Sequence, residues 1–165
     1  MALSRSGVRR ISGGVRVRLT PDERDVLATI PAQLRDVFTG EAGSDDLLTR
    51  LFPPAYDDAL AEAEYHLTRG GELGARRSET LDRYLTSFAK GDDHRAHWVV
   101  DLDWDEAHAW LQVVNDSRLV LATAAGIRTE SDWEAPIDTP ERLLLHWLGW
   151  FQEQLVSALM STLDE

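Results

Sequence analysis

The fold of this chain is decided by TPERLLLHWLGWFQEQLVSALMSTL, residues 139–163. Thr139 followed by Pro140 is typical of a helix start, because the hydroxyl caps the first turn and proline fits its first position. Most of the following residues are apolar, so the apolar surface is wider than the stripe of an ordinary surface helix. We therefore expect a helix that is either buried at the centre of the fold or shared with a second subunit.

One narrow polar stripe interrupts the apolar surface of this helix. Its members are spaced by four, three, four and four positions: Arg142, His146, Gly149, Glu153 and Ser157. A glycine inside a helix costs about 1 kcal/mol relative to alanine, so Gly149 predicts a second backbone packed closely against it. The aromatic cluster of Trp147, Trp150 and Phe151 is interpreted as core or, alternatively, as a partner contact, since aromatic residues are enriched at interface centres.

Length and composition indicate one globular domain. The chain has 165 residues, 43% of them hydrophobic, which is enough to bury a core without disulfides. It contains no cysteine, and this excludes a thiolate metal site, a cysteine nucleophile and a thiol redox switch. No signal peptide is recognisable, and no apolar run approaches the roughly 18 residues of a spanning helix. We expect a cytoplasmic protein without membrane contact.

Charge divides the chain into a short basic part and a long acidic part. Residues 1–19 carry five arginines and no acid, whereas the other 146 residues hold 12 basic and 29 acidic residues, a net charge of −17. An acidic surface repels nucleic acid, so a DNA contact would have to use the basic N-terminus. The candidate contacts are Arg9, Arg10, Arg16 and Arg18. The other interpretation is a solvated hairpin whose arginines protect a sheet edge.

Strand signals occur in two places. Val8–Ile11 and Val15–Leu19 flank Gly13-Gly14, and the second run alternates apolar residues with arginine, which predicts a β-hairpin. A second β-branched run near 97–102 could pair with this hairpin. The preceding Gly91–Asp93 is predicted to form a loop.

Helix signals fill most of the remaining chain. Thr20, Pro21 and Glu23 predict a helix start with a capping box, and Pro31 is expected to kink or split that helix. Further helices are predicted over about 44–51, 57–68, 72–89, 104–125 and 139–163, with a polar loop over 128–138. The expected fold is mainly α, a compact bundle of about five to six helices with a small antiparallel β element. It forms a single domain, 1–165, with a basic hairpin or arm over 1–19 and an acidic helical body over 20–165.

A polar cluster lies inside the apolar helix predicted over 104–125. Asn115 and Arg118 are three residues apart and therefore share a face of that helix. If this face is buried, both side chains need partners. Two interpretations stay open: a polar pocket that positions a ligand or partner, and a structural ion-pair network.

Catalytic and metal signals are weak. His94 and His97 lie beside acidic residues, but in a Gly-Asp loop and at a strand start rather than on one helix face. The sequence contains no phosphate-binding glycine loop and no nucleophile elbow. We therefore expect no catalytic residues, no metal and no cofactor.

Three segments together resemble a known family. They are LFPPAY at 51–56 with the following EAEY at 62–65, the helix segment from Ala109 through NDSRLVL at 115–121, and WLGWFQE at 147–153. These segments resemble the actinobacterial DUF2017 family, also named for the oxidative-stress transcriptional regulator AosR. The resemblance implies a small intracellular protein with a regulatory role. The oxidative-stress role in the family name is not expected of this chain, because a chain without cysteine cannot sense oxidant through a thiol.

These observations predict a non-enzymatic regulatory or interaction protein that acts through protein partners in transcriptional control. The expected binding residues are Asn115, Arg118, Tyr56 and Trp150. Transcription machinery is the expected partner class, and a homodimer is the expected assembly. The alternatives are a DNA-binding regulator that uses the N-terminal arginines and a small metal-dependent hydrolase at His94 and His97.

Overall fold

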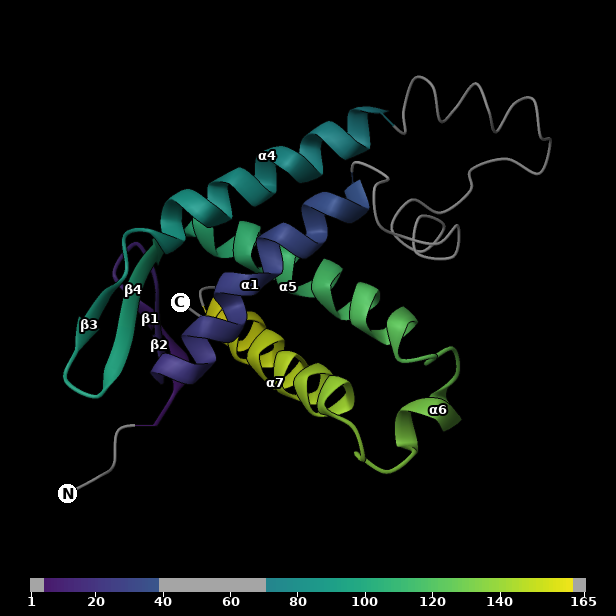
Figure 1. Cartoon of the computed structure of the whole chain (residues 1–165). Helices are drawn as coiled ribbons and strands as arrows, with labels where there is room; N and C mark the ends of the chain where they lie inside the picture. Colours follow the sequence, from purple (N-terminus) through teal and green to yellow (C-terminus); the bar gives the residue numbers. More distant parts are fainter. Residues whose placement is uncertain (1–4, 39–70, 162–165) are drawn as a thin grey trace.

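A computed structural model describes residues 5–38 and 71–161 of the chain. This part forms one four-stranded antiparallel sheet and five helices (Figure 1). The strands are β1 (Gly7–Ile11), β2 (Gly14–Leu19), β3 (Asp92–His94) and β4 (His97–Asp103). The helices are α1 (Pro21–Phe38), α4 (Gly71–Phe88), α5 (Trp104–Ala124), α6 (Glu130–Glu134) and α7 (Pro140–Met160). The predicted mainly α fold with a small antiparallel β element is confirmed.

The sheet confirms the predicted pairing of the hairpin with a later strand. Its order is β1-β2-β4-β3, and β2 pairs with β4 from Gly14 opposite Asp103 to Leu19 opposite Trp98. Val15, Val17 and Leu19 are fully buried on the face that the helices cover. The basic hairpin therefore supplies one of the two central strands of the sheet and part of the core.

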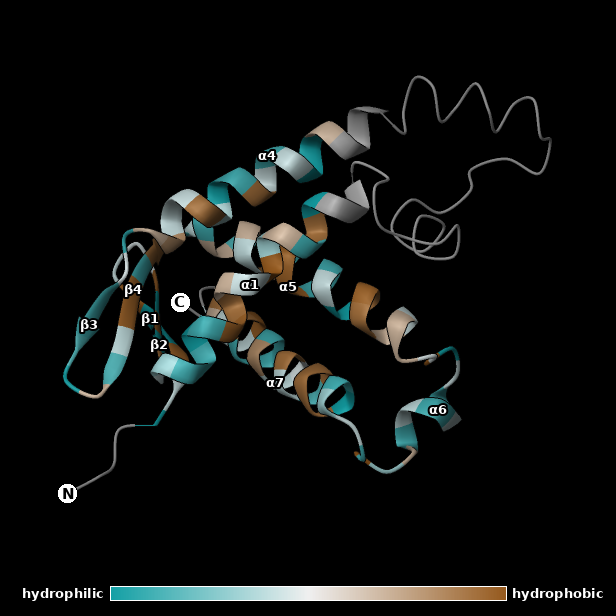
Figure 2. Cartoon of the chain, in the orientation of Figure 1, coloured by the Kyte–Doolittle hydropathy of each residue, from teal (hydrophilic) through white to brown (hydrophobic). Residues whose placement is uncertain are grey.

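Strand β3 corrects the loop predicted over Gly91–Asp93. Asp92–His94 pair with β4, and the connecting turn holds Arg95 at a φ of +59°. All three β3 side chains are exposed, and the strand is hydrophilic along its length (Figure 2). A strand exposed on both faces has no apolar alternation, so the periodicity that reveals half-buried strands is missing.

The two glycines of the hairpin have different roles. Gly13 occupies the turn with a φ of +79°, a conformation that side chains with a Cβ rarely adopt. Gly14 already belongs to β2, where a Cβ would lie 1.8 Å from the Leu102 carbonyl oxygen. One glycine therefore allows the turn and the other allows the close approach of β2 and β4.

Helix α1 continues through Pro31 as one helix, so the predicted alternative of a split helix is wrong. Proline has no N–H, so the carbonyl four residues earlier, on Leu27, loses its helical donor. The Tyr84 hydroxyl of α4 donates to that carbonyl at 2.8 Å. Tyr84 is fully buried, and burial raises the pKa of its hydroxyl far above the usual range, which keeps the proton available for donation.

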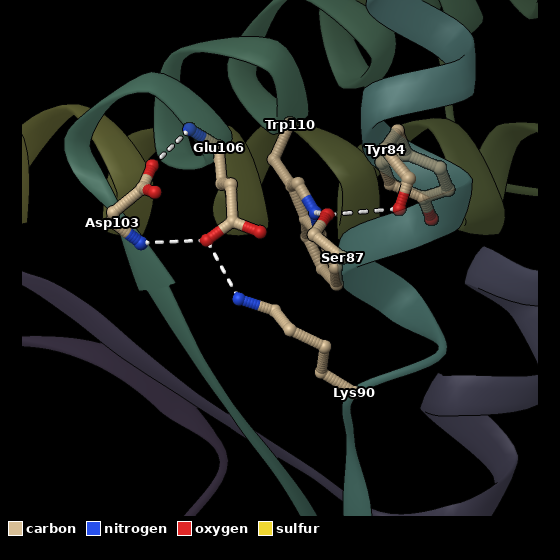
Figure 3. A network of polar contacts seen from close by, with 6 residues as sticks. All are labelled: Tyr84, Ser87, Lys90, Asp103, Glu106 and Trp110. Atoms are coloured by element: carbon tan, nitrogen blue, oxygen red, sulfur yellow. Dashed lines mark hydrogen bonds and ion pairs between the residues drawn. The ribbon is translucent and has the colours of Figure 1, made fainter.

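Capping residues begin the predicted helices. Asp103 and Glu106 form the reciprocal capping box of α5, with hydrogen bonds of 2.8 and 3.0 Å, and Lys90 adds an ion pair to Glu106 (Figure 3). At α1 only half of the expected box forms. Thr20 accepts from the Glu23 N–H, whereas the Glu23 carboxylate accepts from Ser6.

Helix α7 is buried on one face, as the first of the two predicted alternatives requires. Its buried side chains are Leu145, Leu148, Phe151, Leu155 and Ala158, a stripe along the face toward the sheet and α5. Leu143 and Met160 are 63% and 58% exposed, and Trp150 is 36% exposed. The helix is central to the fold on one face and leaves apolar side chains uncovered on another. The helices predicted over 44–51 and 57–68, and with them Tyr56, lie outside the described residues.

The contact between Tyr84 and the Leu27 carbonyl predicts a coupling between Tyr84 and Pro31. Tyr84→Phe removes the hydroxyl donor that replaces the missing proline N–H and is expected to cost about 1–2 kcal/mol of unfolding free energy. In a Pro31→Ala background the restored N–H serves the carbonyl, so the same substitution is expected to cost less. Urea denaturation of the four variants measures the coupling. Equal costs in both backgrounds would contradict this role of Tyr84.

Candidate functional site

An open groove of about 550 Å³ lies where α5, α6 and α7 meet. Its lining is Arg118, Trp133, His146, Gly149, Trp150, Gln152, Glu153, Val156 and Ser157. Four of the five members of the predicted polar stripe of α7 are among these residues. Most of the stripe therefore faces the groove.

Arg118 is the half-buried cation of this groove. Its Nη1 donates to Gln152 Oε1 at 2.8 Å, and its guanidinium lies 5.8 Å from the centre of the Trp133 ring. At Gly149, an added Cβ would lie 3.5 Å from Arg118 Nη2. The neighbour expected at Gly149 was a second backbone. The structure corrects this expectation, because the guanidinium of Arg118 occupies that position.

Trp133 was missed because residues 128–138 were predicted to be a polar loop. They contain α6, which begins at the Thr129 cap with a reciprocal bond to Asp132. The backbone N–H groups of Arg128 and Thr129 bond to the Asp132 carboxylate and hold its pKa below the usual range. The sequence carried one signal of this helix. Thr129 and Asp132 have the spacing of a capping box, and the apolar Trp133 follows them. With a single turn there is no apolar period to recognise.

Helix α6 places the Trp133 ring against α7. The ring stacks on His146 with centroids 4.3 Å apart and an angle of 26° between the planes. Arg142 Nη1 donates to the Asp132 carbonyl at 2.8 Å, which ties α6 to the first turns of α7. These contacts fix the position of the Trp133 ring in the lining of the groove. The partly exposed Trp150 belongs to the same lining.

The predicted binding residues have different positions. Arg118 and Trp150, from two helices, line the same groove, whereas Asn115 is half-buried and is not among the lining residues. The structural ion pair of this segment is made by Asp116, which contacts Arg77 of α4 and accepts from Gln112 at 2.9 Å. Burial raises the pKa of Asp116, and these two contacts oppose that effect.

The N-terminal arginines do not form one surface. Arg9, Arg16 and Arg18 line a second, wider hollow of about 1290 Å³ on the sheet face opposite the buried Val15, Val17 and Leu19. Arg16 is neutralised there by Asp101, with bonds of 2.7 and 2.9 Å that lower the pKa of this carboxyl. Arg10 lies apart from them, because it donates to the Ser161 carbonyl at the end of α7 and stands over Trp104.

His94 and His97 face each other across the β3–β4 turn. His97 Nδ1 lies 3.2 Å from Arg18 Nη2. Within residues 5–38 and 71–161, no group of three or more His, Cys, Asp or Glu side chains is arranged to hold a metal ion.

The described residues define a class of protein: a small antiparallel sheet covered on one face by helices, with an arginine and aromatic rings at an open groove. The chain belongs to the family described as a domain of unknown function, DUF2017, whose model matches residues 5–159. This match confirms the family that the three sequence segments indicated. No curated protein and no solved structure matches the chain. None of the described helices has the length and apolarity needed to cross a membrane.

The packing of Arg118 on Gly149 predicts how substitutions at this glycine behave. A Cβ at 3.5 Å is an ordinary contact, so Gly149→Ala is expected to gain about 0.5–1 kcal/mol of unfolding free energy from helix propensity. Gly149→Leu is expected to displace the guanidinium and to shift the Arg118 Nε–H signal in NMR spectra. Chemical denaturation and these spectra test both variants. A destabilised Gly149→Ala variant would show that the glycine has a different role.

Proposed function

We propose that this protein is a non-enzymatic interaction module that binds a protein partner in the groove between α5, α6 and α7. The observation that carries the proposal is the meeting of Arg118 and Trp150, from different helices, at one open groove. Arginine and tryptophan are the residues most enriched among those that dominate binding energy in protein interfaces. Trp133 adds a second indole to the same lining.

Exposed apolar side chains next to the groove support a protein partner. Leu143 and Trp150 are 63% and 36% exposed, and their spacing of seven residues places them on one side of α7, two turns apart. Uncovered apolar groups that cluster beside a polar rim are typical of interaction sites. The groove can therefore extend into a larger contact surface along α7.

The polar groups of the groove are poorly placed for nucleophilic catalysis. Ser157 and His146 are eleven residues apart on one helix, a rise of about 16 Å, which is too far for a nucleophile and its base. This spacing supports a binding role.

A regulatory role that acts on transcription machinery is part of the proposal, and its support is the family resemblance of the sequence.

Site-directed crosslinking tests the groove as the binding surface. We expect a photo-crosslinking phenylalanine derivative at position 150 to capture a discrete partner in cells that express the chain. The matched control places the same derivative at the exposed position His108 of α5. Arg118→Gln is expected to abolish the crosslinked product, whereas Arg83→Gln, at an exposed arginine of α4, is expected to preserve it.

The same experiment separates the proposal from its competitors. Equal capture at positions 150 and 108, or capture that is unaffected by Arg118→Gln, would argue against the groove. A product of twice the chain mass would identify a second copy as the occupant. In a separate measurement, light scattering that gives a mass of 18.5 kDa at micromolar concentration would exclude the homodimer.

The sheet face that carries Arg16 and Arg18 supports nucleic-acid binding as a second candidate function. Arg5, Arg9 and Arg18 lie together there in an otherwise acidic protein. Asp92 and Asp101 line the same hollow and weaken its attraction for phosphate groups. The direct contribution of the hairpin to DNA binding is best tested by substitution, because removing residues 1–19 would also remove the buried Val15, Val17 and Leu19.

Arg5→Gln combined with Arg9→Gln provides this test. If the second candidate is correct, duplex DNA binds at low salt and the double variant lowers the salt dependence of log K by about 2, one for each phosphate contact. Fluorescence anisotropy at several salt concentrations measures the slope. Absence of duplex binding by the full chain at low salt would eliminate this candidate.

A further inference from the structure

The guanidinium of Arg118 has one edge that no acceptor uses. Nη1 donates to Gln152, whereas Nε is buried and has no hydrogen-bond partner among the described residues. The ion pairs of this part of the chain involve other cations, so Arg118 has no carboxylate partner there. At Nε the guanidinium has lost hydration that no hydrogen bond within the described residues replaces. This imbalance favours an anionic ligand.

Arg16 of the same chain shows what the unused edge can do. Its Nε and Nη2 donate to the two carboxylate oxygens of Asp101 at 2.7 and 2.9 Å. Such bidentate bonds are stronger and more directional than bonds between neutral groups. In Arg118 the corresponding Nε–Nη2 edge lies next to Gly149, with its Nη2 end closest to that residue. The absence of a Cβ there lets this side of the guanidinium pack closely against the α7 backbone.

The surroundings of Arg118 limit the ligand to a single carboxylate with an apolar neighbour. Trp133 lies over the guanidinium, and Trp150 and Val156 supply apolar surface to the same groove. Glu153 is exposed and also lines the groove. Its negative charge offsets that of Arg118, which disfavours a polyanion such as nucleic acid.

We propose that the Nε–Nη2 edge of Arg118 binds a carboxylate of a partner peptide, while an apolar side chain of that peptide packs on Trp150. This inference rests on the proposed function of the groove and adds the chemistry that selects the partner. Because Nε is buried in the free protein, the guanidinium turns toward the groove on binding and retains Gln152 as its neighbour. The carboxylate comes from a chain terminus or from an acidic side chain.

Three short peptides distinguish these sources. Acetyl-Gly-Phe with a free C-terminus offers a terminal carboxylate, acetyl-Glu-Phe-amide offers a side-chain carboxylate, and acetyl-Gly-Phe-amide offers none. Titration up to millimolar concentration is followed by the NMR signals of Arg118 Nε–H and of the Trp150 indole N–H. We expect an acidic peptide to shift both signals and the neutral peptide to bind at least about tenfold more weakly, because it lacks the carboxylate that accepts the two charged hydrogen bonds.

Arg118 variants complete the test. Arg118→Gln is expected to lose the preference for the acidic peptide, Arg118→Lys to retain part of it because the charge stays without the fork, and Arg83→Gln to behave as the unchanged protein. Thermal unfolding confirms that each variant is folded. The inference is overturned if no peptide shifts the signals, if the neutral peptide binds equally well, or if Arg118→Gln keeps the preference. Crosslinking at position 150 that persists under those results would leave the groove as a binding surface and remove only the carboxylate.

Discussion

The packing of Trp110 is the interaction on which the rest of the structure depends. Its ring lies 4.7 to 6.4 Å from those of Tyr84, Phe88, Trp98 and Phe151, which belong to α4, β4 and α7. Its indole N–H donates to Ser87, which in turn donates to the Tyr84 carbonyl (Figure 3). Tyr84 then reaches the Leu27 carbonyl of α1. A network of buried hydrogen bonds stabilises a core only when its members are paired. This network connects α1, α4 and α5, and the ring contacts of Trp110 add β4 and α7.

The same core determines how α7 presents the groove. Phe151 packs against Trp110 and is fully buried, whereas the preceding Trp150 is partly exposed. Successive residues of a helix diverge by about 100°, so burying one aromatic side chain turns its neighbour toward solvent. Gly149 then faces α5, where the missing Cβ leaves space for Arg118. The groove is a consequence of the orientation that the Trp110 contacts impose on α7.

Charge pairing distinguishes Arg118 from the carboxylate-paired arginines Arg16 and Arg77. In a chain with 29 acidic and 17 basic residues, a carboxylate partner is easily supplied, as Arg77 and Arg16 show with Asp116 and Asp101. Arg118 lacks such a partner within residues 5–38 and 71–161 and contacts only neutral or aromatic groups there. This lack of a counter-charge at a residue that lines the groove is the basis of the proposed carboxylate contact.

The sequence by itself determined the starts of α1, α5 and α7, the hairpin, its pairing with a run near residues 97–102 and the polar stripe of α7, because these depend on short-range spacing. It also selected Arg118 and Trp150, although Tyr56 lies outside the described residues. Short exposed elements such as β3 and α6 have no apolar period, so they escaped prediction and Trp133 with them. Only the tertiary structure decided that Arg118, and not Asn115, lines the groove and that a side chain packs on Gly149. A shared helix face follows from spacing, but the rotation of that helix against its neighbour is determined by contacts distant in the chain.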